Sequence, residues 1–215
     1  MRYRLAIFDL DGTLADSFPW FSRVLNEVAD RYRFKRVEPH EIDALRTMDA
    51  RALMRHFGIP AWKMPFIANH MRKRKSRELD QTRLFEGVDR MLRDLSDAGI
   101  ALALVSSNSE ANCRGILGAE NARLIHHYEC GASLFGKSAF FRRVLRKTGM
   151  PAREAICIGD EIRDLDAARK EGIDFGAVTW GYTAAEALTA HAPTVVFRTV
   201  DEIVEQLAHS ASRRA

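Results

Sequence analysis

Short apolar runs alternate along the chain with longer segments in which apolar residues recur at helical spacing. Five runs have the length of a strand and occupy residues 5–8, 100–105, 155–158, 175–178 and 195–197. Continuous apolar runs of this length are typical of strands that are buried on both faces of a sheet. Strands that alternate with helices favour an α/β fold, here a Rossmann-like parallel sheet with helices on both faces.

The interval between the first and second runs is too long for a simple crossover connection, and its own pattern is helical. Apolar residues recur at helical spacing over residues 18–32. We therefore predict an all-helical insertion formed by residues 15–84. The core domain is then formed by residues 1–14 and 85–215.

Local signals within the insertion mark further helices. Asp49 is placed to cap the start of one helix, and Gly58 is placed to end it. Pro65 is suited to the first turn of another helix, which runs toward Leu79. These signals predict that helices fill most of the insertion.

Length and composition narrow the class of protein. The 215 residues are enough for one sizeable core with an inserted module. A content of 47% hydrophobic and 29% charged residues excludes an intrinsically disordered chain. No stretch approaches the roughly 18 to 20 consecutive apolar residues of a membrane span. The net charge of +4 does not by itself indicate a nucleic-acid partner.

The cysteines and the N-terminus predict the compartment. Cys113, Cys130 and Cys157 are odd in number and have no metal-ligand spacing. The N-terminal apolar run ends within a few residues at Asp9, which is too short for a signal peptide. We therefore expect reduced thiols and a cytoplasmic location.

Polar residues follow the apolar runs at the points where a parallel sheet binds its ligands. Asp9 and Asp11 follow the first run and precede Gly12, which permits a sharp turn. Carboxylates at i and i+2 lie on the same side of an extended chain, where they repel each other unless a cation or a proton lies between them. A hard divalent ion with oxygen ligands meets this need. One carboxylate could then attack phosphorus while its neighbour moves the proton.

The segment 8–17 resembles the first motif of the haloacid dehalogenase-like hydrolases in their phosphatase form. The resemblance continues in order along the chain. Ser106 follows the second run, Lys137 opens a helical segment, and residues 159–164 resemble the acidic fourth motif of the family. The helical insertion lies where this family carries a cap domain.

The resemblance implies a Mg²⁺-dependent phosphatase. Asp9 would be the nucleophile that forms an aspartyl-phosphate, and Asp11 would act as general acid and then as general base. Asp9, the backbone carbonyl of Asp11, and Asp160 would hold the Mg²⁺. The implied substrate is a small phosphorylated metabolite, with 2-phosphoglycolate as the leading candidate, and the implied enzyme is a monomer or a homodimer.

Further residues acquire roles by the same resemblance. Ser106 would bind a phosphate oxygen, and Lys137 would balance the charge on the nucleophile and the phosphoryl group. The candidate substrate-binding residues are Gly12, Thr13, Arg46, Ser107 and Asn108.

Other interpretations remain open at this point. A phosphomutase of the same superfamily would share the first chemical steps. Residues 131–138 match the P-loop pattern G-x-x-x-x-G-K-[ST], and residues 124–129 could supply the strand before it. That interpretation leaves Asp9 and Asp11 unexplained. A non-catalytic binding module would retain the fold without turnover.

Several positions depart from the phosphoglycolate-phosphatase-like pattern or stay ambiguous. The cap loop often has Arg-Gly in that group, whereas Arg46 is followed by Thr47, so the identity of the substrate is open. Asp164 could support the metal site or cap a helix, and the sequence does not decide whether Glu161 contacts the metal. The basic run 72–77 is typical of a solvated helix face, although it could steer a phosphorylated substrate.

Overall fold

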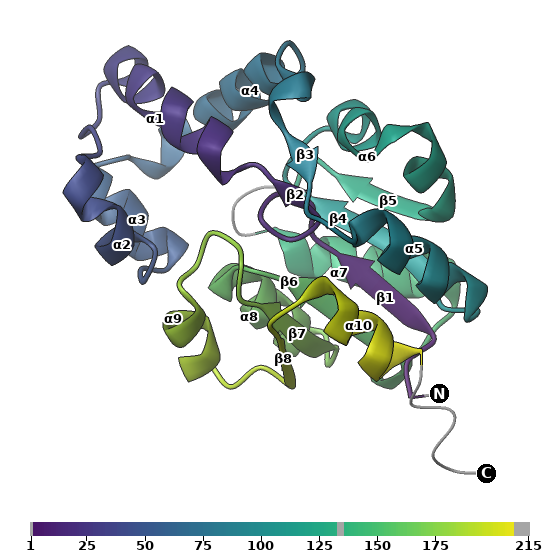
Figure 1. The fold of residues 1–215 in the computed structure, drawn as a ribbon. Helices are drawn as coiled ribbons and strands as arrows, with labels where there is room; N and C mark the ends of the chain where they lie inside the picture. The colour runs from purple at the N-terminus through teal and green to yellow at the C-terminus, as the bar shows by residue number, and fades with distance from the viewer. Residues whose placement is uncertain (1, 133–135, 209–215) are drawn as a thin grey trace.

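A six-stranded parallel sheet forms the centre of the molecule (Figure 1). The computed structural model describes residues 2–132 and 136–208. The strands are β1 (Leu5–Phe8), β4 (Ala101–Ser106), β5 (His127–Cys130), β6 (Ala155–Gly159), β7 (Asp174–Val178) and β8 (Val195–Phe197). Their order in the sheet is β5-β4-β1-β6-β7-β8, and each neighbouring pair is parallel. The carboxyl ends of β4, β1 and β6 are therefore adjacent.

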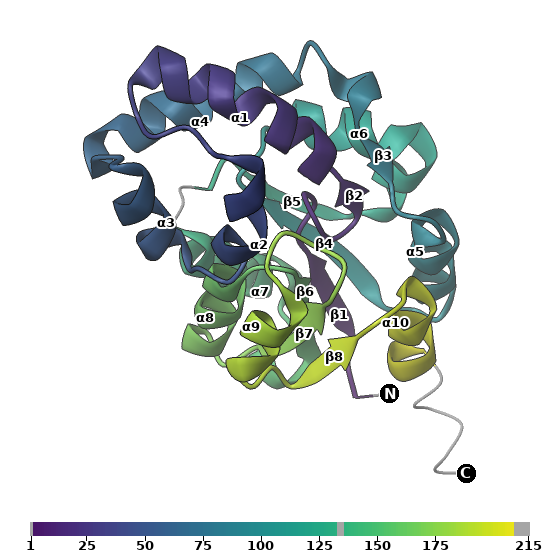
Figure 2. The same cartoon turned by 60° about the vertical axis from the view of Figure 1, so that its left-hand side comes forward.

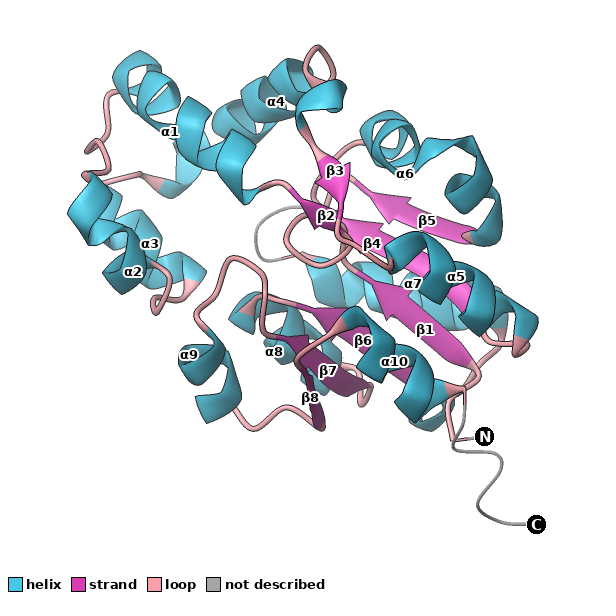
Figure 3. Cartoon of the chain, viewed as in Figure 1, coloured by secondary structure: helices cyan, strands magenta, loops and turns pink. Residues whose placement is uncertain are grey.

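Helices cover both faces of this sheet (Figure 3). One face is covered by α5 (Val88–Asp97), α6 (Glu110–Leu124) and α10 (Val200–Leu207). The opposite face is covered by α7 (Lys137–Thr148), α8 (Ile162–Lys170) and α9 (Ala185–Ala190). The predicted α/β fold with a parallel sheet between two helical layers is confirmed.

The central strand β1 contributes to both halves of the core. Ala6 and Phe8 pack into the cluster under α5, α6 and α10. Leu5 and Ile7 pack into the cluster under α7, α8 and α9. All four side chains are fully buried, since alternate residues of a strand point to opposite faces of the sheet. This two-sided burial is the reason that the strand is a continuous apolar run.

The edge strand β5 was not among the five strands that the apolar pattern predicted, and this part of the prediction was incomplete. β5 pairs only with β4 and carries polar residues. The carboxylate of Glu129 is buried and is paired with Arg143 at 2.8 Å and with Lys147 at 2.7 Å, both from α7. A strand of this kind is stabilised by ion pairs from a covering helix, which leave no apolar run in the sequence.

Residues 15–84, which we call the cap, leave the sheet after β1 and return before α5 (Figure 2). Their helices are α1 (Phe18–Tyr32), α2 (Ile42–Leu45), α3 (Ala50–Phe57) and α4 (Met64–Lys75). The prediction of an all-helical insertion was wrong at its base, where β2 (Ala15–Asp16) and β3 (Arg83–Leu84) form an antiparallel pair. Strands of two residues are too short to leave a recognisable alternation. We propose that the cap is a separate unit from the core, 1–14 and 85–215.

The local helix signals of the cap are confirmed in part. The Asp49 side chain accepts a hydrogen bond from the Ala52 amide at 2.7 Å, and Gly58 ends α3 with a φ of 64°. Pro65 lies in the first turn of α4, but this helix ends at Lys75, before Leu79. Within the described ranges of the chain, no helix is both long enough and apolar enough to cross a membrane.

Candidate active site

Three polar residues meet at the carboxyl ends of adjacent strands. Asp9 follows β1, Ser106 ends β4, and Asp160 follows β6. The register pairs Phe8 with Leu104 on one side and with Ile158 on the other. Asp9, Ser106 and Asp160 are each no more than 4% exposed. The sheet therefore brings together residues that are far apart in the sequence.

The backbone turn after β1 packs closely against the Asp160 side chain. Gly12 has a φ of 83°, and a Cβ atom at this position would lie 2.3 Å from Asp160 Oδ2. The Thr13 hydroxyl donates a hydrogen bond to Asp160 Oδ1 at 2.8 Å. The Thr13 hydroxyl thus holds the carboxylate of Asp160, and the absence of a side chain at Gly12 leaves room for it; substrate binding by Gly12 and Thr13 stays a prediction.

Replacement of Gly12 by Ala is expected to lower both stability and turnover. The new methyl group would meet Asp160, and a positive φ is unfavourable for Ala, so the unfolding free energy is expected to fall by about 1–3 kcal/mol. Gly58→Ala is a matched control, because Gly58 also has a positive φ but has nothing within 4 Å of its Cβ position. Thermal melts and phosphatase kinetics test this expectation. Equal activity of the two variants would contradict the role assigned to Gly12.

Lys137, the first residue of α7, points into the site. Its Nζ atom lies 2.9 Å from Asp9 Oδ1 and 2.7 Å from Asp164 Oδ2, and the residue is 2% exposed. Burial opposes the charge of Lys137, but the neighbouring carboxylates of Asp164 and Asp9 raise its pKa above the ordinary value. The two carboxylates thus favour the charged form of Lys137 beside Asp9.

This placement separates the two interpretations of Lys137. Of the segment 131–138 that matches the P-loop pattern, residues 133–135 lie outside the described residues. The Lys137 ammonium contacts the candidate nucleophile, as the phosphatase interpretation requires. The geometry therefore favours that interpretation over a nucleotide-binding loop.

The Asp164 carboxylate contacts Lys137 within the site. Burial raises its pKa to about 6, although the attraction of Lys137 opposes this shift. Its second oxygen, Oδ1, is buried and has no hydrogen-bond partner among the described residues. The contact of Asp164 with Lys137 is neither of the two roles that the sequence left open, and support of the metal site stays a prediction. The N-cap of α8 is Glu161 and not Asp164.

Glu161 and Arg163 form a partly buried pair that sequence reasoning did not single out as a unit. The Arg163 guanidinium donates a hydrogen bond to Glu161 Oε1. Both side chains line a cavity that lies between the cap helices and the site. The opposite charges of Glu161, Asp164 and Asp9 raise the pKa of Arg163, although burial opposes this. Arg163 Nε is buried, and no residue in the described part of the chain accepts a hydrogen bond from it. The fourth-motif segment thus supplies a cation as well as carboxylates.

Asp11 occupies a more open position than Asp9 and lines the same cavity. Its Oδ2 accepts a hydrogen bond from Asn108 Nδ2 at 3.2 Å. The Asn108 side chain is itself oriented by Asn112, which donates to Asn108 Oδ1 at 2.8 Å. The backbone amide of Asn108 donates a hydrogen bond to the Ser106 hydroxyl at 3.1 Å. The turn after β4 therefore orients Asp11 and the predicted phosphate-binding residues together.

Arg46 joins the cap to a core loop and also lines the cavity, and its contact with an anionic substrate stays a prediction. Its guanidinium donates to the carbonyl oxygens of Tyr182 at 3.1 Å and Gly181 at 2.9 Å. The Tyr182 amide in turn donates to Asp160 Oδ2 at 2.7 Å. Sequence reasoning missed this link, because Arg46 binds backbone carbonyl oxygens of the loop and no side-chain pattern records such a contact.

The basic run 72–77 is not the uniform solvated face that its composition indicated, and the prediction was wrong for one member. Lys75 is 2% exposed, and its Nζ lies 2.5 Å from Thr82 Oγ1 and 3.9 Å from the centre of the Trp20 ring. Met71 and Lys75 lie one helical turn apart on α4, and both line the cavity. Helical periodicity therefore turns Lys75 inward and places Arg72 at the cavity wall, whereas Lys73, Ser76 and Arg77 are exposed.

The chemistry of the acidic residues fits a divalent cation. Asp160 is fully buried, and burial together with the negative charges of Glu161 and Asp9 raises its pKa well above the ordinary value. A hard cation with oxygen ligands would relieve this repulsion. Among residues 2–132 and 136–208, no three His, Cys, Asp or Glu side chains form a metal cluster by themselves. This is compatible with Mg²⁺, which commonly uses one or two carboxylates together with phosphate and water.

Comparisons with known proteins bear on the family and on the fold. The family model described as haloacid dehalogenase-like hydrolase matches residues 6–178. A phosphoglycolate phosphatase of Synechococcus elongatus is 28% identical over 93% of this chain and 94% of its own length. The tyrosine-protein kinase PtkA of Mycobacterium tuberculosis is 30% identical over 95% of this chain and 72% of the kinase. A crystal structure of a predicted phosphatase from Clostridium acetobutylicum has a TM-score of 0.81 at 21% identity, covering 97% of this chain and all of that one.

Proposed function

The chain belongs to the haloacid dehalogenase-like hydrolase family, and on this basis we propose that it is a Mg²⁺-dependent phosphatase of small phosphomonoesters. The observation that carries the proposal is the contact of Lys137 Nζ with Asp9 Oδ1 at 2.9 Å. This contact combines a candidate nucleophile with a cation at the carboxyl end of β1, where Asp11 is also available. Phosphoryl transfer depends chiefly on such positioning and on the stabilisation of negative charge.

In the first half of the reaction, an oxygen of Asp9 attacks the phosphorus atom of the substrate. The bond between phosphorus and the leaving alcohol breaks, and Asp11 delivers a proton to the leaving oxygen. The product of this half-reaction is an aspartyl-phosphate on Asp9 and a free alcohol. The position of Asp11 at the cavity wall, next to Asn108, supports its role as the acid.

In the second half of the reaction, Asp11 removes a proton from a water molecule that attacks the same phosphorus atom. The bond between phosphorus and Asp9 breaks, and inorganic phosphate leaves. Asp11 thereby serves as acid in one step and as base in the next, so each cycle restores its protonation state.

The charges around the transferred phosphoryl group come from several elements. Lys137 balances the nucleophile and the phosphoryl oxygens, and Ser106 with the amide of Ser107 binds those oxygens. Asp9, the carbonyl of Asp11, and Asp160 would hold Mg²⁺. When bound, this ion stabilises negative charge on the phosphoryl oxygens.

Loss of the Lys137 charge is expected to reduce kcat/KM for p-nitrophenyl phosphate by about 10²–10³-fold, by analogy with other single electrostatic contacts to a transition state. Lys137→Met removes the ammonium while keeping most of the buried stem. Lys147→Met is the matched control on the same helix, because Lys147 is half exposed and pairs with Glu129. Steady-state kinetics on both variants measure the difference.

The same variant tests the nucleotide-binding interpretation. Calorimetry with ATP and Mg²⁺ is expected to show no tight binding that depends on Lys137. Tight ATP binding that is lost in Lys137→Met, together with no phosphomonoesterase activity in the wild type, would reverse the assignment.

A metabolite screen tests the proposed function directly. Purified protein with Mg²⁺ is expected to release inorganic phosphate from p-nitrophenyl phosphate and from members of a phosphomonoester panel. 2-Phosphoglycolate belongs in the panel, as the substrate that the sequence resemblance implied and that the Synechococcus relative is named for. An isomerised sugar phosphate without phosphate release would indicate a phosphomutase, and no turnover on any member would indicate a binding module.

We also propose that the enzyme is cytoplasmic and that it is a monomer or a homodimer. The free thiols of Cys113, Cys130 and Cys157 support the compartment. Fractionation of the producing cells and light scattering of the purified protein test the two statements separately.

A further inference from the structure

A cavity of about 870 Å³ lies between the cap helices and the candidate active site. Its base carries Asp11, Ser107 and Glu161, and its walls come mainly from α1, α3 and α4. Pockets of about 300–1,000 Å³ typically hold organic ligands of drug size. The space beside the catalytic residues therefore exceeds what a phosphate with a two-carbon leaving group needs.

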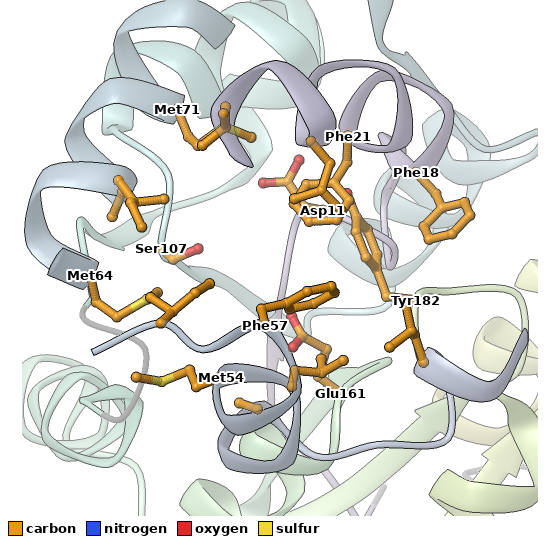
Figure 4. Close-up of a pocket in the computed structure, with 18 of the residues that line it drawn as sticks. Asp11, Phe18, Phe21, Met54, Phe57, Met64, Met71, Ser107, Glu161 and Tyr182 are labelled. Atoms are coloured by element: carbon orange, nitrogen blue, oxygen red, sulfur yellow. The ribbon is translucent and has the colours of Figure 1, made fainter. Parts of the chain in front are cut away.

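The walls of this cavity are apolar (Figure 4). Phe21 from α1, Met54 and Phe57 from α3, and Met64 and Met71 from α4 line it. Methionine side chains are flexible and polarisable, and they adapt to apolar groups of varied shape. Such a wall gains free energy by covering hydrocarbon and offers little to a charged group.

The cationic side chains at the cavity are engaged with the protein. Arg46 donates to the carbonyls of Gly181 and Tyr182, and Arg72 donates to the carbonyl of Ser107 at 3.1 Å. The other cationic residues that line the cavity in the described part of the chain are Lys75 and Arg163. Lys75 donates to Thr82, and Arg163 donates to Glu161. Each of these cations thus donates at least one hydrogen bond to the protein, and the walls formed by α1, α3 and α4 are lined mainly by apolar side chains, which favour a hydrocarbon group over a second charged group.

We propose that the substrate of this site is a phosphomonoester whose alcohol is an extended, uncharged alkyl or aryl group held by the methionine and phenylalanine side chains of the cap. This inference rests on the proposed phosphatase function and specifies its leaving group. The phosphate lies at the Asp9 and Asp11 end of the cavity, and the hydrocarbon extends along α3 and α4. Hydrolysis then gives an apolar alcohol and inorganic phosphate, with water as the co-substrate.

A homologous series of substrates tests the proposal. With Mg²⁺ present, kcat/KM is expected to rise about two- to fourfold for each methylene added from ethyl to octyl phosphate, because each buried methylene contributes favourably to binding. 2-Phosphoglycolate is expected to be a poorer substrate than octyl phosphate. A flat or falling series, or a preference for 2-phosphoglycolate, would overturn the inference while leaving the phosphatase function intact.

Variants of the wall locate the effect. Met54→Gln combined with Met71→Gln is expected to lower the ratio of kcat/KM for octyl over ethyl phosphate by about tenfold or more, since two apolar contacts become polar. Phe66→Gln is the matched control on α4, because Phe66 is 61% exposed. An unchanged ratio in the double methionine variant would count against the assigned wall.

Binding of non-hydrolysable analogues separates this inference from the proposed function. Calorimetry is expected to show that octylphosphonate binds more tightly than ethylphosphonate, and that the difference shrinks in the double methionine variant. Equal affinity of the two phosphonates would overturn the inference even in an active phosphatase. Tighter binding of octylphosphonate by a protein without turnover on any ester would retain the apolar site and reject the catalytic proposal.

Discussion

Asp9→Asn is expected to reduce turnover of p-nitrophenyl phosphate by about 10⁴-fold or more, in the range found when a catalytic nucleophile is removed. An amide cannot attack phosphorus to form the acyl phosphate, although it has almost the same shape as the carboxylate. The fold is expected to survive. Lys137 keeps Asp164 as a partner at 2.7 Å, and burial of Asp9 already disfavours its charged form and raises its pKa.

Three measurements make this test decisive. Thermal melts compare the fold of Asp9→Asn with that of the wild type, intact-mass measurement excludes reversion of Asn to Asp, and mass spectrometry of acid-quenched enzyme detects the aspartyl-phosphate. Asp97→Asn is the control, because Asp97 is an exposed aspartate at the end of α5. Wild-type turnover in a folded, unreverted Asp9→Asn enzyme would falsify the assignment of the nucleophile.

Removal of divalent metal is expected to lower activity by about 10³-fold, and added Mg²⁺ is expected to restore it. The physical reason is the charge balance of the site, since a bound metal ion typically contributes several kcal/mol to stabilisation of the transition state. Lys137 contacts the carboxylates of Asp9 and Asp164, Arg163 is a further nearby cation, and the incoming phosphate adds further negative charge. A chelator titration followed by readdition of Mg²⁺ measures the effect.

A second readout separates metal binding from turnover. Mg²⁺ is expected to raise the melting temperature of the wild type, because a ligand that binds only the folded state stabilises it. The rise is expected to be lost in Asp160→Asn and retained in Asp97→Asn. Full activity of enzyme shown by elemental analysis to be metal-free would eliminate the proposed metal site.

The fold class was predictable because its signals are local. Each strand of the sheet interior, such as β1, is buried on both sides and must therefore be apolar throughout. The turn signals of the cap, Asp49 and Gly58, act within a few residues of their own position. β5 escaped prediction because its stability comes from the pairing of Glu129 with residues of α7, which no local pattern records.

The candidate site could likewise be predicted only in part from the sequence. Asp9, Ser106 and Asp160 could be predicted to converge, because carboxyl ends of adjacent parallel strands meet at one edge. Lys137 could be identified from its motif, but its contact with Asp164 could not. The inward turn of Lys75 was also hidden, since a basic run has the composition of a solvated face whichever side of the helix packs against the core.

The amino-acid sequence by itself established an α/β sheet with an inserted cap and an acidic pair after the first strand, since strand periodicity and motif spacing are properties of neighbouring residues. The partners of Asp160 became known only in three dimensions. Thr13 lies 147 positions away along the chain and Tyr182 lies 22 positions away, yet both hydrogen-bond its carboxylate. The apolar cavity is likewise lined by side chains from separate cap helices. Its shape depends on how these helices pack together over the sheet, and no single segment of the sequence encodes that packing.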